Sequence, residues 1–200
     1  PTLFIYYIND MPEMVDCAIR IFADDTKAYS SVETEDKRKK LQENLDQLVK
    51  WTDQWLLHFN STKCKVIHMG KKNQNYEYFI REGVTNNLLE SVHSEKDLGV
   101  VVDEDLTFDD HITEVIKRAN RISSLLIRTI MFKNKNIMVP LFKALVRPIL
   151  EYGNVVWCPR LKKHITNIEN VQRRFTKCII GQRNLSYEER LRSLNLPSLE

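Results

Sequence analysis

The spacing of apolar residues changes along this chain from short alternating runs to long helical repeats. Residues 17–30 alternate with a period of two, with Ile19 and Ile21 on one face, and the alternation resumes after two acidic residues. This pattern predicts a β-hairpin that turns at Ala23–Thr26. The apolar run over residues 1–8 instead has the length expected of the last turns of a helix.

A helix and several short strands are predicted between the hairpin and residue 108. Thr34 is a suitable N-cap, and apolar residues then recur every three or four positions, which predicts a helix that ends near Asn60. The short strands are expected at residues 63–70, 76–81, 86–92 and 100–102, with a turn at 103–105 and a returning strand at 106–108. Residues 1–108 are therefore predicted to mix helix and strand.

The remaining residues are predicted to be entirely helical. Asp109 or Asp110 can cap a first helix, whose apolar face runs from Ile112 to Ile130. Further helices are expected at residues 136–153, disturbed by Pro148 and ended by Gly153, at residues 165–181, ended by Gly181, and from the capping box Ser186–Glu189 onward. The sequence thus predicts the α+β fold class, with two regions at residues 1–108 and 109–200.

The two regions also differ in charge. Residues 111–200 hold 17 Lys and Arg against 6 Asp and Glu, a balance of +11, whereas residues 1–110 hold 13 against 21, a balance of −8; together these give the net charge of +3. A basic region is the usual footprint of nucleic-acid binding, although charge asymmetry between solvated helix faces would give the same count. The charge pattern therefore favours a polyanionic partner for the helical region.

Other features narrow the class of protein. With 42% hydrophobic and 28% charged residues, the composition is that of a globular chain, and no apolar run approaches the roughly 18–20 residues that a membrane span needs. The four cysteines are scattered and form no Cys-x-x-Cys pair. We therefore expect a reduced intracellular protein without a membrane partner, and the sequence indicates no oligomeric state.

Two adjacent carboxylates, Asp24 and Asp25, occupy the predicted hairpin turn. Neighbouring like charges repel one another unless a cation compensates them. Mg²⁺ suits such a pair, because it binds one or two carboxylates together with waters and substrate phosphates. A solvated turn is the other interpretation, since Asp is favoured in turns for conformational reasons alone.

The residues around this pair resemble a known motif. Phe22-Ala23-Asp24-Asp25 between two strands is similar to the Phe/Tyr-x-Asp-Asp motif of reverse transcriptases. The surrounding segments resemble, in the same order, motifs of the LINE-type polymerases of non-LTR retrotransposons such as jockey and CR1: LFIYYINDMPE, WTDQWLLHFNSTKCKVIHMG, KDLGVVVDEDLTFDDHI, LVRPILEYGNVVWCP, IENVQRRFTKCIIG and LSYEERLRSLNLPSLE. This resemblance covers essentially the whole chain and implies a C-terminal palm and thumb portion of an RNA-directed DNA polymerase.

The resemblance implies roles for individual residues. Asp24 would be a direct ligand in a site for two Mg²⁺ or Mn²⁺ ions, and Asp25 would be its less direct partner. Leu98, Gly99 and Val100 would hold the 3′ end of the primer. Other contacts would come from Lys63, near the incoming deoxynucleoside triphosphate, and, along the phosphates of RNA template and DNA primer, from Lys117, Arg118, Arg121, Arg173 and Arg174. Action in the nucleus is implied by the resemblance as well.

The family's catalysis requires further parts that we expect to lie outside these residues. They are a third carboxylate on an earlier strand and a fingers region that closes on the nucleotide. We therefore expect residues 1–108 to form a truncated palm with an exposed sheet edge, followed by a thumb-like helical region, and the chain to be inactive alone. Three alternatives stay open: a non-catalytic nucleic-acid-binding module, an unrelated Mg²⁺-dependent hydrolase that uses Asp24 and Asp25, and the product of a decayed reading frame.

Overall fold

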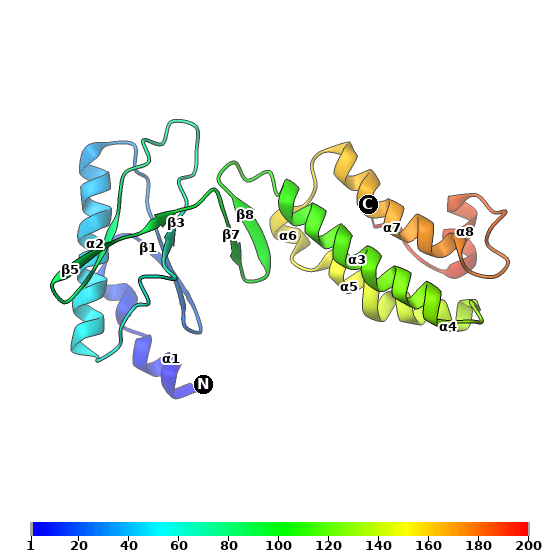
Figure 1. The fold of residues 1–200 in the computed structure, drawn as a ribbon, viewed down its shortest axis with the longest axis horizontal. Helices are drawn as coiled ribbons and strands as arrows, with labels where there is room; N and C mark the ends of the chain where they lie inside the picture. The colour runs from blue at the N-terminus through cyan, green and yellow to red at the C-terminus, as the bar shows by residue number, and fades with distance from the viewer. Residues whose placement is uncertain (1, 200) are drawn as a thin grey trace. The chain divides into compact units, whose positions relative to one another are not determined.

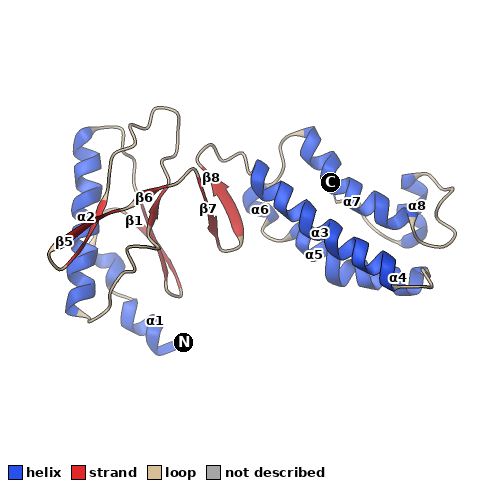
Figure 2. Ribbon diagram, viewed as in Figure 1, coloured by secondary structure: helices blue, strands red, loops and turns tan. Residues whose placement is uncertain are grey.

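The computed structural model describes residues 2–199 of a chain that forms two compact units, divided between residues 95 and 96. Helices and small strands are both present (Figures 1 and 2), in agreement with the predicted α+β class. The hydrophobic pattern placed the boundary near residue 108. The structure divides the chain earlier, because a strand that begins at residue 100 belongs to the second unit together with the helices.

The first unit opens with short helical segments and the predicted hairpin. Its first elements are α1 (Thr2–Ile8), a 3₁₀ turn (Met11–Met14), β1 (Ala18–Phe22) and β2 (Asp25–Tyr29). The two strands pair antiparallel, and Phe22 lies directly opposite Asp25. The turn is therefore shorter than predicted and consists of Ala23 and Asp24. Such two-residue turns fit the right-handed twist of paired strands.

Helix α2 (Glu35–Gln54) follows and contributes buried residues to both core clusters of this unit. The predicted N-cap is confirmed, because the Thr34 side chain accepts a hydrogen bond from the backbone N–H of Lys37. The helix ends before the predicted Asn60, since Leu56 adopts a left-handed backbone with φ 54°. Its buried residues pack against the preceding segments in one cluster: Ile8, Met11, Ile19, Leu48 and Trp51.

Short strands complete the first unit. They are β3 (Lys65–Val66), β4 (Phe79–Glu82), β5 (Thr85–Leu88) and β6 (Glu90–Ser91). Strand β3 pairs parallel with β6, and β4 pairs antiparallel with β5. The predicted strand over residues 63–70 is thus reduced to two residues. Every sheet within the described part of this unit has two strands.

The predicted strand at Val100–Val102 is confirmed, but its predicted partner is wrong. Strand β8 (Val100–Asp103) pairs with β7 (Ser94–Asp97), whereas residues 106–108 form a loop instead of a returning strand. The Asp103 carboxylate holds that loop, because it accepts three backbone N–H groups, those of Asp105, Thr107 and Phe108, at 2.7–3.1 Å. With its polar groups satisfied by this side chain, the loop needs no strand pairing.

Helices make up the rest of the second unit. They are α3 (Asp109–Thr129), α4 (Lys135–Leu141), a π-helical turn (Phe142–Val146), α5 (Arg147–Glu151), α6 (Asn154–Trp157), α7 (Lys162–Lys177) and α8 (Tyr187–Leu194). Asp109 and Asp110 lie in the first turn of α3, after the N-cap Phe108, and do not cap it. The capping box of Ser186 and Glu189 is confirmed. Helix α8 ends well before the predicted Glu200, at a left-handed Asn195.

The disturbance predicted from Pro148 is confirmed as a widened turn. Proline has no backbone N–H, so the helix before it cannot keep its regular hydrogen bonds. Instead the N–H of Arg147 donates to the carbonyl of Phe142, five residues earlier, which is the π-helical pattern. The side chains that face the core across this segment are Met138, Phe142, Val146 and Leu150, all buried.

One continuous apolar core joins the helices of the second unit. Phe142 and Phe175 meet at its centre with ring centroids 4.8 Å apart, and both are fully buried. Val100 of β8 and Ile112 of α3 extend the same core toward the hairpin. In the part of the chain that the structure describes, none of the helices combines the length and the apolar character that a bilayer crossing requires.

Candidate catalytic and nucleic-acid-binding sites

The Asp24–Asp25 pair lies at the tip of the β1–β2 hairpin, where both residues are exposed. Asp24 is the second residue of the turn, and Asp25 is the first residue of β2. The preceding Ala23 has a left-handed backbone, φ 53°, which a residue with a Cβ adopts at a cost. Backbone strain of this kind is found at functional turns, and here it accompanies two carboxylates presented to solvent.

The two hairpin carboxylates can supply some, but not all, of the ligands that a hard divalent cation needs. Mg²⁺ takes oxygen ligands and keeps several waters, so one or two protein carboxylates suffice when substrate phosphates supply the rest. Among residues 2–199 no group of three or more Asp, Glu, His or Cys side chains could hold a metal ion. Asp24 and Asp25 could therefore hold such an ion only together with ligands from other groups.

Two further features of the first unit are Lys63 and a cavity at Tyr78. Lys63 is exposed in a turn closed by its own backbone N–H, which donates to the carbonyl of Asn60 at 2.9 Å.

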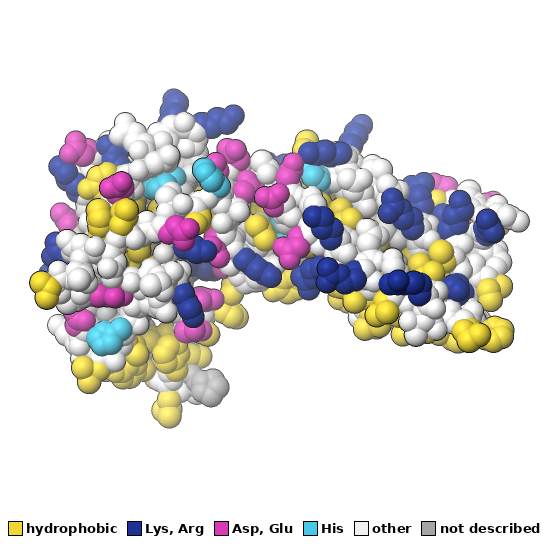
Figure 3. Space-filling model, in the orientation of Figure 1, with side chains coloured by type: hydrophobic (Ala, Val, Ile, Leu, Met, Phe, Trp, Pro, Cys, Tyr) yellow, Lys and Arg dark blue, Asp and Glu magenta, His cyan; other side chains and the backbone are white. Residues whose placement is uncertain are grey.

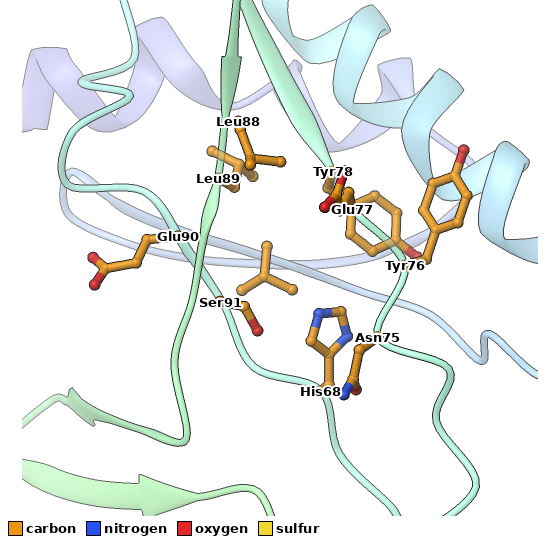
Figure 4. A pocket seen from close by; sticks show the side chains of 10 residues that line it. His68, Asn75, Tyr76, Glu77, Tyr78, Leu88, Leu89, Glu90 and Ser91 are labelled. Carbon is orange, nitrogen blue, oxygen red and sulfur yellow. The ribbon is translucent and has the colours of Figure 1, made fainter.

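A cavity of about 230 Å³, which the sequence did not indicate, lies between β6 and the segment before β4 (Figure 4). Tyr78 lines this cavity, and its buried hydroxyl has no hydrogen-bond partner within residues 2–199. The residues that line the cavity are scattered aromatic and polar residues, and their spacing along the chain has no periodicity that would predict a cavity.

The residues predicted to hold the primer form the turn between β7 and β8. Leu98 and Gly99 both have left-handed backbones, φ 45° and 87°, as a two-residue turn of type I′ requires. Leu98 is exposed, whereas Val100 is 5% exposed and packs in the core of the second unit. The turn thus presents Leu98 and the backbone around Gly99, while Val100 fixes the strand below it.

The predicted phosphate contacts lie on two helices that pack together. Lys117, Arg118 and Arg121 are exposed on α3, and Arg173 and Arg174 are exposed on α7. Within residues 2–199 no ion pair involves any of these five side chains. Figure 3 shows Lys and Arg gathered over the helices of this unit. A basic surface of this kind can track phosphates without reading sequence.

Arg173 is held in place by a buried polar network that the sequence analysis missed. Its guanidinium lies 4.3 Å from the ring centroid of Tyr187. The Tyr187 hydroxyl donates to the buried carboxylate of Glu169 and accepts from Gln172. Burial and the hydrogen bond to Glu169 raise the pKa of Tyr187 well above its usual value, so the phenol stays neutral. Arg173 therefore stacks on a fixed aromatic ring.

A second polar group joins the start of α3 to the start of α7. The Asp109 carboxylate lies 3.0 Å from the Lys163 ammonium and 2.7 Å from Nε2 of the buried His164. The hydrogen bond from Lys163 is the largest cause that lowers the pKa of Asp109. Lys163 is thus engaged in an ion pair, unlike the five predicted phosphate contacts.

Comparison with known proteins identifies relatives along nearly the whole chain. It is 31% identical to the RNA-directed DNA polymerase from mobile element jockey of Drosophila funebris and 28% identical to that of Drosophila melanogaster. It is 25% identical to the probable RNA-directed DNA polymerase from transposon X-element of Drosophila melanogaster. Each match covers 90% of this chain and 21% of the relative, so the chain spans about a fifth of the length of these proteins.

Neither of two other comparisons gives a match: no family model and no solved structure is similar to the chain. The relatives, however, are polymerases of the kind that the Phe22–Asp25 motif and its ordered neighbours predicted. The chain is therefore homologous to the jockey-type RNA-directed DNA polymerases, the reverse transcriptases of non-LTR retrotransposons.

Proposed function

We propose that this chain is the palm-hairpin and thumb portion of a retrotransposon reverse transcriptase. The carrying observation is the exposed Asp24–Asp25 pair on a two-residue hairpin turn, in a chain whose relatives are RNA-directed DNA polymerases. In this proposal Asp24 and Asp25 hold Mg²⁺ or Mn²⁺. Such ions activate the attacking primer hydroxyl and stabilise the leaving oxygen in nucleotidyl transfer.

Residues 1–200 alone are not expected to synthesise DNA. The described residues offer two adjacent carboxylates and no larger ligand group, and the relatives are about five times longer. Positioning and electrostatic stabilisation supply most of the rate in phosphoryl transfer, so an incomplete metal site removes most of it. We propose that the missing ligand and the nucleotide-closing region are supplied by other parts of a longer polymerase.

Primer extension tests this function. In a polymerase that contains this segment, Asp24→Asn is expected to reduce extension of a DNA primer on an RNA template by at least about a hundredfold, because one carboxylate ligand of the metal is lost. Asp36→Asn, which alters an exposed acid in the first turn of α2, is the matched control and should leave the rate unchanged. Extension by residues 1–200 alone, abolished by Asp24→Asn, would contradict the proposed dependence on further parts.

A second function is supported by the basic surface of α3 and α7: sequence-independent binding of a primer–template duplex. The five predicted phosphate contacts are exposed and form no ion pair among residues 2–199. This binding does not need the metal site, so it could be retained in a non-catalytic module derived from the same element.

The salt dependence of binding tests the second function. Each phosphate contact contributes about −0.9 to the slope of log affinity against log salt for a DNA duplex. Replacing Lys117 and Arg121 by Gln should make the slope shallower by up to about 1.8. Replacing Lys71 and Lys72, exposed in the first unit, changes the net charge equally and should leave the slope unchanged. Equal effects of both pairs would show that binding depends on net charge alone.

A further inference from the structure

The turn at Leu98 and Gly99 is held by the segment that follows α5. The hydroxyl of Tyr152 donates to the carbonyl of Leu98 at 2.9 Å. The same ring lies against the turn, because a Cβ placed on Gly99 would come within 3.2 Å of Cε1 of Tyr152. Gly99 therefore allows both the left-handed backbone and the close approach of the tyrosine ring.

The next residue of that segment, Gly153, lies equally close to the next residue of the hairpin, Val100. A Cβ placed on Gly153 would lie 3.2 Å from Cγ2 of Val100, the first residue of β8. The indole N–H of the buried Trp157 donates to the carbonyl of Tyr152 at 2.7 Å. Tyr152 is thus fixed at its backbone by the core and reaches the turn with its hydroxyl, although its side chain is 59% exposed.

A third contact ties the same strand to α3. Nδ1 of His111 accepts a hydrogen bond from the backbone N–H of Val101 at 3.2 Å. His111 is buried, and its ring meets Trp157 edge to face with centroids 5.2 Å apart. Burial lowers the pKa of His111, which keeps the ring neutral and Nδ1 able to accept. Since His111 is the third residue of α3, the hairpin is attached to the helix that carries the basic residues.

We propose that Tyr152 and His111 are positioning residues that set the distance between the Leu98–Gly99 turn and the phosphate contacts of α3. This inference rests on the nucleic-acid binding proposed above. Helix α3 rises about 15 Å from His111 to Arg121, at 1.5 Å per residue. Arg121 thus lies about 15 Å along the axis of α3 from the residue that bonds to β8. The turn at the primer end and Arg121 would then contact one duplex in a fixed register.

Hydrogen exchange tests the positioning without any nucleic acid. Tyr152→Phe keeps the ring against Gly99 and removes the hydroxyl, so amide exchange at residues 98–101 should rise about fivefold, the factor expected for one hydrogen bond. His111→Phe keeps an aromatic ring beside Trp157 and removes the acceptor for Val101, with a similar rise expected. Tyr6→Phe, at an exposed tyrosine of the first unit, is the control. Unchanged exchange in both variants would overturn the inference.

Duplex binding tests the consequence. The chain should bind a duplex with a recessed primer 3′ end more tightly than a blunt duplex of equal length, by fluorescence anisotropy. Tyr152→Phe should reduce this preference about fivefold and leave the salt slope unchanged, which a general loss of folding would not do. A wild-type preference that Tyr152→Phe does not alter overturns the positioning role alone. A wild-type chain that binds neither duplex contradicts the proposed binding function itself.

Discussion

The two units of this protein bury their apolar residues in different ways. The second unit has one continuous core that runs from β8 through α3 to α8. The first unit has two small clusters, to both of which α2 contributes. Both units expose large apolar side chains, such as Leu3 in the first and Val155 in the second. Because two small clusters bury less apolar surface than one continuous core, we expect the first unit to be the less stable of the two.

This contrast assigns different roles to the two halves. The second unit can hold its basic residues and the Leu98–Gly99 turn with its own core. The first unit presents Asp24 and Asp25 on a hairpin, and Phe22, the last residue of β1, is exposed beside them. The resemblance implies a truncated palm with an exposed sheet edge, and an edge strand presents unpaired backbone groups. In the proposed polymerase, other parts of the protein would cover the hairpin.

The largest effect is expected from a cavity in the continuous core. Phe142→Ala removes a fully buried ring that packs on Phe175, and such changes cost about 3–5 kcal/mol of unfolding free energy. Chemical denaturation, followed by hydrogen exchange in each unit, should show the loss in residues 96–200 and an unchanged first unit. Equal destabilisation of both units would mean that they fold as one body, and the contrast between their cores would then carry no consequence.

A smaller effect, with a pH dependence, is expected at the loop before α3. Burial would raise the pKa of Asp103, but the backbone N–H groups of Thr107, Phe108 and Asp105 outweigh it and lower the pKa below its usual value. A carboxyl with a lowered pKa in the folded state stabilises the fold above its unfolded pKa, and this stabilisation is lost as the pH falls through the folded value. Asp103→Asn should cost about 1 kcal/mol at pH 7.

The pH profile of that variant distinguishes a charge effect from a packing effect. The difference in unfolding free energy between Asp103→Asn and the wild type should shrink as the pH is lowered below about 4, the usual range for Asp. Asp105→Asn, at the exposed position two residues later, is the control. A difference that is constant from pH 7 to pH 3 would contradict the role of the Asp103 charge.

The smallest effect is expected at the hairpin tip of the first unit. Ala23→Gly should stabilise the fold by about 0.5–1 kcal/mol, because glycine adopts the left-handed backbone of φ 53° without strain. Thermal unfolding of the first unit measures this gain. Ala28→Gly, within β2, should be destabilising instead and serves as the control. A loss of stability in Ala23→Gly would show that the turn is not strained in solution.

Local chemistry predicted the elements that depend on neighbouring residues. The Thr34 N-cap, the capping box at Ser186 and the β1–β2 hairpin each follow from a few adjacent side chains, and all are confirmed. The partner of β8 could not be predicted in this way. Leu98 is not a typical residue for a left-handed turn, so no turn was predicted there and residues 106–108 were expected to pair with β8 instead.

The candidate site residues show the same division between local signals and long-range contacts. Asp24 and Asp25 were predicted as candidate metal ligands because the motif is contiguous, and the basic residues of α3 were predicted to lie off its apolar face because of helical periodicity. Tyr152 bonds to Leu98 of the turn, 54 positions away in the chain, and His111 bonds to Val101 of β8, 10 positions away. A contact of this kind has no local signature, so it requires the folded structure.

The widened turn before Pro148 has a consequence for how helical repeats are counted. Met138, Phe142, Val146 and Leu150 are all buried and lie four residues apart. On a regular helix each step of four residues overshoots a full turn by about 40°, so three steps would rotate the last residue by about 120° away from the first. The additional residue in the turn at Phe142–Val146 absorbs part of this drift. Buried residues spaced strictly four apart around a proline therefore indicate, from sequence alone, a helix that contains a π-helical turn.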